Sequence, residues 1–338
     1  MKWLRKHYKK LIIFSFLYLF LLFFFLYPLP YEIYLPGGID DAGSFIEITD
    51  ATKSTGSYNL SYVSVITRPS PFQYIYHYFD DKNDFYKLSE EDNLLSNKEM
   101  KIRSNLYKRS SINNSVIAAY NASKKKLYKV SDGVVVIDMI YNTPSYRALK
   151  IGDIIKEFNG IDVNNKEELL YFLSQVDCGI NFNLTILRDN KEIVVTLAKE
   201  KINDRCIIGF YEDYLYTNYQ FDFTNSYPQF NIIDYSGYGP SAGLMQALTI
   251  YDMLEPIDLT QGKKIAGTGT IDENGKVGPI GGIKHKILGA CKCQVDIFFT
   301  PYVHYEEAKR ALELMPCQMT IVPVATLNDA IAYLKERL

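Results

Sequence analysis

The chain has 338 residues, of which 22% are charged and 47% belong to the hydrophobic set, which excludes a disordered chain and a multi-span membrane protein. The 37 basic and 39 acidic residues nearly cancel, so a nucleic-acid binder that relies on excess basic charge is excluded as well. With 20 glycines, 13 prolines and 5 cysteines, the chain is not collagen-like, low-complexity or a disulfide scaffold. At about 150 residues per domain, the length predicts two or three units.

The N-terminus has the pattern of a membrane anchor. Residues 1–10 carry five lysines and arginines and no acid, and residues 11–27 (LIIFSFLYLFLLFFFLY) carry no charge. A helix of that apolar length spans about 26 Å, near the lower limit for crossing a bilayer. A cleaved signal peptide is the alternative, but no A-x-A-like site follows. We predict an uncleaved signal anchor whose residues 11–27 contact lipid. The basic flank places the N-terminus in the cytoplasm and residues 31–338 outside it, at the cell membrane.

Cysteine usage predicts no metal site. The five cysteines are spread along the chain, and Cys291 and Cys293 form a C-x-C pair without the second pair that a zinc site needs. One disulfide is compatible with an oxidising compartment, and unpaired buried thiols are the alternative. We expect no cofactor.

Residues 31–125 have two different patterns. Residues 31–80 alternate apolar and polar positions between glycine-containing turns, and Tyr58–Ile66 has the period of a half-buried strand. Residues 81–125 are charged and compatible with a helix. We therefore expect a β-rich membrane-proximal segment followed by a solvated helical connector.

Residues 126–200 have the elements of a compact domain. A strand is predicted at Gly133–Met139 and another at Ile154–Phe158, and Asn159-Gly160 is a hairpin turn. Helical spacing follows over 165–176, and two further strands over 182–188 and 192–197. Together with the L-x-x-G-D-x-I-x-x-x-N-G run that starts at Leu149, this segment resembles a PDZ domain of the bacterial protease type. The resemblance implies binding of extended peptides by strand addition. The loop before Gly133 lacks the glycine-rich carboxylate cradle of that family, and a spacer role is the alternative.

Two glycine-rich segments in the last third of the chain are candidates for chemistry. In the first, residues 235–243 read YSGYGPSAG, and apolar residues at helical spacing follow. Ser241 is therefore expected at the start of a helix, where free N–H groups can stabilise an oxyanion. The turn residues assigned to this role are Gly239, Pro240, Ala242 and Gly243.

The second segment supplies a base for the serine. Residues 267–290 read GTGTIDENGKVGPIGGIKHKILGA, in which a glycine turn again leads into a helix. A lysine can deprotonate a serine if apolar surroundings lower its pKa to about 7–8. Lys286 follows Ile283 by three residues and precedes Ile287, so we predict it on the buried side of the helix, with Lys284 facing solvent.

Both segments together resemble the proteolytic domain of Lon-type serine/lysine peptidases, over residues 203–336. The resemblance implies Ser241 as nucleophile, Lys286 as general base and Thr268 as the residue that supports the lysine amine. The family often has an acid just before G-P-S-A-G, where this chain has Tyr238, and Asp234 is the candidate replacement. The order of anchor, PDZ unit and protease domain also resembles a group of bacterial membrane-anchored proteases without an AAA ATPase. No phosphate-loop motif occurs in these 338 residues.

The predicted fold class is α+β multidomain. The expected units are residues 1–30 (cytoplasmic tip and transmembrane signal anchor), 31–125 (β-rich segment and connector), 126–200 (PDZ domain) and 201–338 (Lon-type proteolytic α/β domain). The expected function is ATP-independent cleavage of unfolded or C-terminal protein segments outside the cytoplasm, by a homo-oligomer that binds neither nucleic acid nor ATP. The alternatives are a non-catalytic PDZ scaffold of the cell envelope and an esterase with a Ser241/Asp296/His304 triad.

Overall fold

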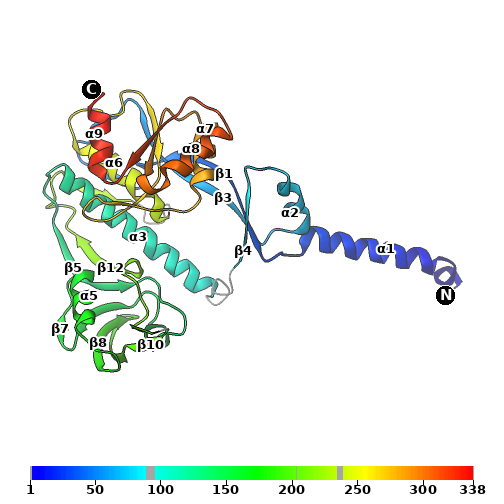
Figure 1. Ribbon diagram of the computed structural model, residues 1–338, viewed down its shortest axis with the longest axis horizontal. Coiled ribbons are helices and arrows are strands. Elements are labelled where there is room, and N and C mark those ends of the chain that lie inside the picture. Colours follow the sequence, from blue (N-terminus) through cyan, green and yellow to red (C-terminus); the bar gives the residue numbers. More distant parts are fainter. Residues whose placement is uncertain (1, 89–95, 203, 234–238, 338) are drawn as a thin grey trace.

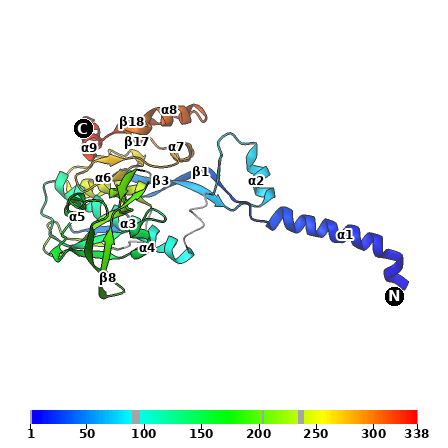
Figure 2. The ribbon, with the colours of Figure 1, turned by 60° about the horizontal axis from the view of Figure 1, so that its bottom comes forward.

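The N-terminal helix projects away from the rest of the molecule. The structure is a computed structural model that describes residues 2–88, 96–202, 204–233 and 239–337. Helix α1 (Lys2–Leu26) extends to one side of the body in both views (Figures 1 and 2). Its stretch His7–Leu26 has a mean hydropathy of 2.1, and none of it is buried against the protein. The helix is thus long and apolar enough to cross a membrane.

A six-stranded mixed sheet forms the centre of the body. Its strand order is β18-β17-β14-β3-β1-β4, parallel from β18 to β3 and antiparallel from β3 to β4. The bounds are β1 (Tyr31–Asp41), β3 (Ser57–Thr67), β4 (Asp84–Lys87), β14 (Lys264–Gly267), β17 (Ile297–Pro301) and β18 (Thr320–Val324). The strand predicted at 58–66 is therefore present as β3.

This sheet differs from the predicted division of the chain. Residues 31–125 were expected to form a separate unit, but β3 pairs with β14 in parallel, with Tyr58 opposite Ile265. Tyr58 and Leu60 are buried in the same core as Leu248 of the C-terminal region. Local periodicity identifies a strand but not a partner 207 positions along the chain, which is why the sequence pattern missed this pairing.

Helices cover both faces of the sheet. On one face lie α6 (Gly243–Leu254) and α9 (Leu327–Lys335), and on the other lie α7 (Ile283–Lys292) and α8 (Tyr305–Glu313). The alternation of strand side chains produces the two cores, since Phe299 packs toward α6 and α9 while its neighbour Phe298 packs toward α7 and α8. This larger unit, called the protease part below because the sequence resemblance implies a proteolytic domain there, is thus a three-layer α/β unit.

Helix α3 (Asn97–Ala122) lies between the protease part and the smaller domain (Figure 1). It starts at a capping box formed by Ser96 and Glu99. The prediction of a solvated connector is not met: in the first half Arg103 forms a 3.0 Å ion pair with Asp138, and Leu106 and Tyr107 pack against the smaller domain. Ile112, Val116 and Tyr120 are fully buried against α6, so the second half belongs to the protease core.

The smaller domain has the PDZ elements in the predicted order. Its sheet runs β12-β5-β6-β8-β9, with β7 beside β6. The bounds are β5 (Lys129–Val136), β6 (Ile154–Phe158), β7 (Ile161–Asp162), β8 (Asn181–Arg188), β9 (Lys191–Ala198) and β12 (Leu215–Phe221), with helices α4 (Pro144–Ala148) and α5 (Lys166–Ser174). Asn159 and Gly160 both have positive φ, which the predicted two-residue hairpin requires.

Strand β12 lies beyond the predicted domain boundary at residue 200, yet it belongs to the PDZ sheet. It pairs with β5, and Leu215 is buried in the PDZ core beside Val134 and Val136. Where the PDZ domain joins the rest of the chain, Lys126 and Tyr227 exchange two backbone hydrogen bonds of 3.2 and 2.8 Å. The PDZ domain is therefore inserted between two segments of the protease part, with its two ends held together.

The remaining elements are short. They are α2 (Pro71–Tyr78); the strand pairs β2 (Ile46–Ile48) with β13 (Phe230–Ile232), β10 (Glu200–Ile202) with β11 (Arg205–Ile207), and β15 (Thr270–Ile271) with β16 (Val277–Gly278); and the 3-10 turns η2 (Glu212–Tyr214), η3 (Pro240–Ala242) and η4 (Tyr302–His304).

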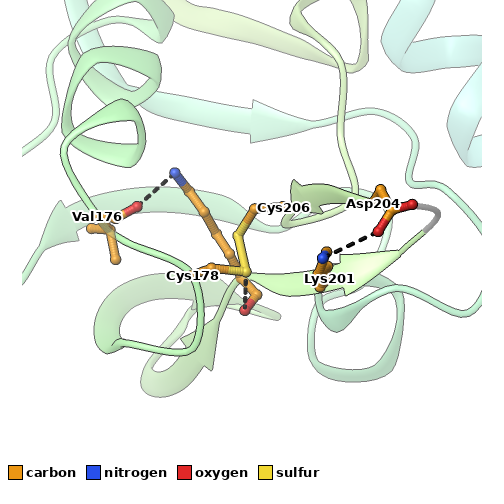
Figure 3. The surroundings of a disulfide bond; sticks show 6 residues. Val176, Cys178, Lys201, Asp204 and Cys206 are labelled. Carbon is orange, nitrogen blue, oxygen red and sulfur yellow. Dashed lines mark hydrogen bonds and ion pairs between the residues drawn. A yellow bond between two sulfur atoms is a disulfide. The ribbon is translucent and has the colours of Figure 1, made fainter.

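Two disulfides are present, whereas the sequence left open one disulfide or unpaired buried thiols. Cys178–Cys206 links the segment after α5 to β11, beside the Lys201–Asp204 ion pair (Figure 3). Cys291–Cys317 links the end of α7 to the segment before β18, and Cys293 is a free thiol. Each bridge closes a short loop, of 28 and 26 residues.

Candidate active site

Ser241 lies in the 3-10 turn η3, directly before α6, as the sequence predicted. The turn approaches a neighbouring strand closely, because a Cβ on Gly243 would lie 2.9 Å from a side-chain carbon of Ile271 and 3.1 Å from its backbone nitrogen. Glycine is therefore required at position 243. At Gly239, in contrast, an added Cβ would meet nothing within 4 Å.

The predicted oxyanion role of the helix start is not met by the first amides of α6. The amide of Ala242 donates to Gly239 O at 3.0 Å, that of Gly243 to Pro240 O, and that of Leu244 to Gly269 O at 3.0 Å. These three donors are engaged within the protein in this conformation. Tyr238, which stands where the family often has an acid, and Asp234, the candidate replacement for that acid, lie outside the described residues.

Lys286 reaches Ser241 from α7. Its Nζ lies 2.7 Å from Ser241 Oγ and 2.9 Å from Thr268 Oγ1. Helix α7 is placed for this contact by Gly282, which has φ +70° and whose Cβ would lie 2.8 Å from Val63 of β3. The helix can therefore lie directly against the sheet, with Lys286 directed inward.

Burial sets the protonation of this lysine. Lys286 is 4% exposed, and desolvation lowers its pKa to about 8. No acidic side chain pairs with it among the described residues. Lys284, two positions earlier, forms a 2.8 Å ion pair with Asp84. Lys286 is thus buried, as predicted, whereas Lys284 is half-buried in an ion pair and does not face solvent freely.

Thr268 fixes the geometry of both partners. It is fully buried at the end of β14, and its Oγ1 donates to Ser241 O at 3.0 Å while accepting from Lys286 Nζ. The amide of Gly269 donates to the same carbonyl at 2.8 Å. Because the only hydroxyl proton of Thr268 goes to the Ser241 carbonyl, its lone pairs face the lysine. A neutral amine can then donate one hydrogen to Thr268 and accept the proton of Ser241.

The alternative triad is not assembled. His304 Nε2 accepts the amide of Ile280 at 3.1 Å, and its Nδ1 lies 3.5 Å from Glu307. Asp296 accepts the amide of Lys264 at 2.8 Å. With Nε2 occupied as an acceptor by a backbone group, His304 has no lone pair to offer Ser241. These residues fix loops in the protease part.

Helix α3 supplies contacts that sequence reasoning missed. Ser115 Oγ lies 3.0 Å from Gly243 O, Ser111 Oγ lies 3.3 Å from Pro240 O, and Asn114 Nδ2 donates to Ile271 O at 3.0 Å. The signal was the run SSINNS at 110–115, where small polar residues interrupt a helix that becomes apolar afterwards. Such residues in a buried helix indicate hydrogen bonds to neighbouring backbone.

His285 is a second residue that the sequence did not single out. Its side chain is 1% exposed, and burial lowers its pKa, since desolvation outweighs the effect of Asp84, whose Oδ2 lies 3.5 Å from Nε2. It points toward β4, whereas Lys286 points toward Ser241. The residue therefore belongs to the contact between α7 and β4.

Comparison with known proteins identifies both domains. Residues 236–336 match the family of the Lon protease (S16) C-terminal proteolytic domain, and residues 115–198 match the PDZ domain family. Similar curated proteins include Lon proteases from Trichlorobacter lovleyi (31% identical over 99 residues, 29% of this chain and 12% of the relative), Campylobacter jejuni (35%, 28% and 12%) and Methanosphaera stadtmanae (34%, 28% and 11%).

The similarity to these relatives is confined to one domain, since the chain spans about 12% of their length. Among solved structures, the PDZ domain of an SdrC-like protein from Listeria innocua is 22% identical over 23% of this chain and 90% of that chain, with a TM-score of 0.22. The PDZ match covers β5 to β9 and reaches back into α3, and the Lon match covers α6 to α9, so each match covers only a portion of the folded part described above. This chain therefore contains a PDZ domain and a Lon-type proteolytic domain.

Proposed function

We propose that the protein is a membrane-anchored serine endopeptidase that works without ATP, with Ser241 as nucleophile and Lys286 as general base. The observation that carries this proposal is the 2.7 Å contact between Lys286 Nζ and Ser241 Oγ, in a buried setting that lowers the lysine pKa to about 8. Both groups lie in the domain that matches the Lon proteases.

The proposed reaction is a series of proton transfers through Lys286. Ser241 Oγ attacks the peptide carbonyl while its proton passes to the neutral Lys286 amine. The resulting ammonium then gives a proton to the leaving amine, which leaves an acyl-enzyme on Ser241. Lys286 next takes a proton from a water molecule, which attacks the acyl carbon. As the ester bond to Ser241 breaks and the product acid leaves, the Lys286 ammonium returns that proton to Ser241 Oγ and becomes neutral again. Thr268 holds the amine in place throughout and acts as a positioning residue.

The location of this activity is inferred from two features. Helix α1 is apolar over His7–Leu26, and the basic residues before it favour a cytoplasmic N-terminus. The two disulfides suit an oxidising compartment, as expected of an extracytoplasmic body. We infer a single-pass protein of the cell membrane, with its PDZ and protease domains outside the cytoplasm. A homo-oligomer is part of the same proposal, by analogy with Lon-type proteases.

The PDZ domain is proposed to recruit unfolded or C-terminal segments of substrate. Strand β5 has a neighbour on each side, β12 and β6, so an added peptide strand would pair with one of the outer strands, β12 or β9. Of these, β12 continues into the chain that leads to Ser241, whereas β9 lies at the far edge of the sheet. We favour β12, because a peptide bound there lies on the strand that is connected to the active site.

The test is cleavage of casein by the full-length chain in detergent, without ATP. Ser241→Ala and Lys286→Ala should each abolish cleavage, whereas Lys284→Ala, the matched control on the same helix, should retain it. If His304→Ala abolishes cleavage and Lys286→Ala does not, the esterase-type triad is correct instead. If the unaltered chain captures partners through its PDZ domain but cleaves no protein or peptide offered, the scaffold alternative is correct.

A further inference from the structure

Helix α2 carries an exposed apolar stripe. Phe72, Ile75, Tyr76 and Phe79 follow one another at i, i+3, i+4 and i+7, so they lie on one side of the helix and its C-terminal end. They are 42%, 50%, 70% and 84% exposed. Residues 71–79 include no Asp, Glu, Lys or Arg. Four large exposed side chains on two successive helical turns without a charged residue are unusual for a protein surface that contacts only water.

The stripe begins at the end of the apolar helix α1. The ring of Phe72 lies 5.0 Å from that of Phe25 and 5.9 Å from that of Phe24, centroid to centroid, in the last turn of α1. The backbone also joins the two segments, since the amide of Leu29 donates to Pro69 O at 2.9 Å. Both views place α2 beside this end of α1, apart from the PDZ domain (Figures 1 and 2). The stripe therefore lies at the level where a bilayer around α1 would end.

The opposite side of α2 is fixed to the body. Tyr74 packs against Tyr31 at 5.2 Å and against Phe85 at 4.8 Å, centroid to centroid. The helix starts at a capping box between Ser70 and Gln73. These contacts hold α2 as a formed helix with its stripe directed away from the sheet. The first charged residues after α2 are Asp80 and Asp81, and the backbone carbonyl of Asp81 accepts a hydrogen bond from Lys284 of the protease part.

We propose that α2 lies in the headgroup region of the bilayer, with the stripe inserted toward the acyl chains, as a second membrane contact beside α1. Aromatic side chains favour this region, and short amphipathic helices bind there through one apolar face. The inference rests on the proposed anchoring by α1, because lipid around α1 is what brings the bilayer to Phe72. A second contact beside α1 limits how far the protease body can tilt relative to the membrane.

Depth-dependent quenching of tryptophan tests this directly. The full-length chain, with Trp3 replaced by Phe, is reconstituted in phosphatidylcholine vesicles whose acyl chains are either unmodified or dibrominated. Tyr76→Trp and Phe79→Trp probe the stripe, Phe16→Trp probes α1, and Tyr171→Trp is the matched control. Tyr171 is 61% exposed, close to the 70% of Tyr76, and belongs to α5 of the PDZ domain. Helix α5 lies far from α1 (Figure 1).

The expected result is a loss of emission in brominated vesicles for Phe16→Trp, Tyr76→Trp and Phe79→Trp, with none at Tyr171→Trp. If Phe16→Trp is quenched while both stripe probes emit like the control, the α2 contact is refuted and the anchor stands. If Phe16→Trp is not quenched, the anchoring itself is wrong and the α2 proposal falls with it. Stripe probes that are shielded from iodide in water yet unquenched by bromine would indicate a protein partner and also overturn the proposal.

Discussion

Cleavage should rise about tenfold per pH unit below pH 7 and level off above about pH 9, because only the neutral form of Lys286 can take the proton of Ser241. With a lysine pKa of about 8, about one-tenth of the molecules carry a neutral amine at pH 7 and about one-hundredth at pH 6. Burial is the cause of the shift, and no nearby carboxylate among the described residues opposes it. The ascending limb is therefore expected well above the pKa of an ordinary histidine side chain.

The assay is kcat/KM on an internally quenched peptide from about pH 6 to about pH 10, with the full-length chain in detergent. The matched control is Lys284→Met, which removes a lysine from the same helix but one that pairs with Asp84 instead of Ser241. It should leave the midpoint of the limb in place. A profile that is flat from pH 6 upward, or a rate that falls as pH rises through 8, would refute a neutral Lys286 as the base.

Three further predictions concern stability, measured by denaturant unfolding at pH 7. The pKa of Lys286 is about 8 in the folded protein and 10.5 in the unfolded chain, so the unfolded chain binds the proton more tightly. Below pH 8 this difference lowers the free energy of unfolding by about 3 kcal/mol, and the loss disappears as the pH rises to 10.5. Lys286→Met should thus stabilise the inactive protein by about 1–2 kcal/mol after loss of two hydrogen bonds; destabilisation would contradict this. Gly289→Ala should cost about 1–3 kcal/mol, because its Cβ would lie 2.8 Å from the backbone of β1, whereas Gly281→Ala, with open space around it, should be neutral. Cys178→Ser should destabilise the PDZ domain by about 3–4 kcal/mol, as expected for a 28-residue loop, and an unchanged transition would mean that the bridge does not form.

Local sequence signals predicted the parts of the fold that depend on near neighbours. The apolar run of α1, the hairpin at Asn159-Gly160 and the glycine turns before α6 and α7 each need only a few consecutive residues to specify them. The position of Ser241 just before α6 and that of Lys286 on the buried side of α7 followed from the helical spacing of the apolar residues near them. Their contact needs the whole sheet, because residues 45 positions apart meet only when β3, β14 and β17 are in register.

What the sequence could not indicate is long-range pairing. The assignment of β3 to the protease sheet, of β12 to the PDZ sheet and of the second half of α3 to the protease core all depend on partners about 80 or more positions away. Each of these segments has an ordinary local pattern. The polar residues of α3 that contact the Ser241 turn looked like solvated side chains for the same reason, since their acceptors are backbone carbonyls of a distant segment.

The two hydrogen bonds between Lys126 and Tyr227 determine where this protein can be cut into working parts. A fragment that begins at residue 201 would lack β1, β3 and β4, which are half of the central sheet, and also α3, the helix beneath the Ser241 turn. Removing residues between Lys126 and Tyr227 and closing the gap with a short turn would keep every strand of that sheet. The PDZ domain is thus an insertion that could be removed or replaced, and the protease domain is a single folded unit formed by the two chain segments that flank it.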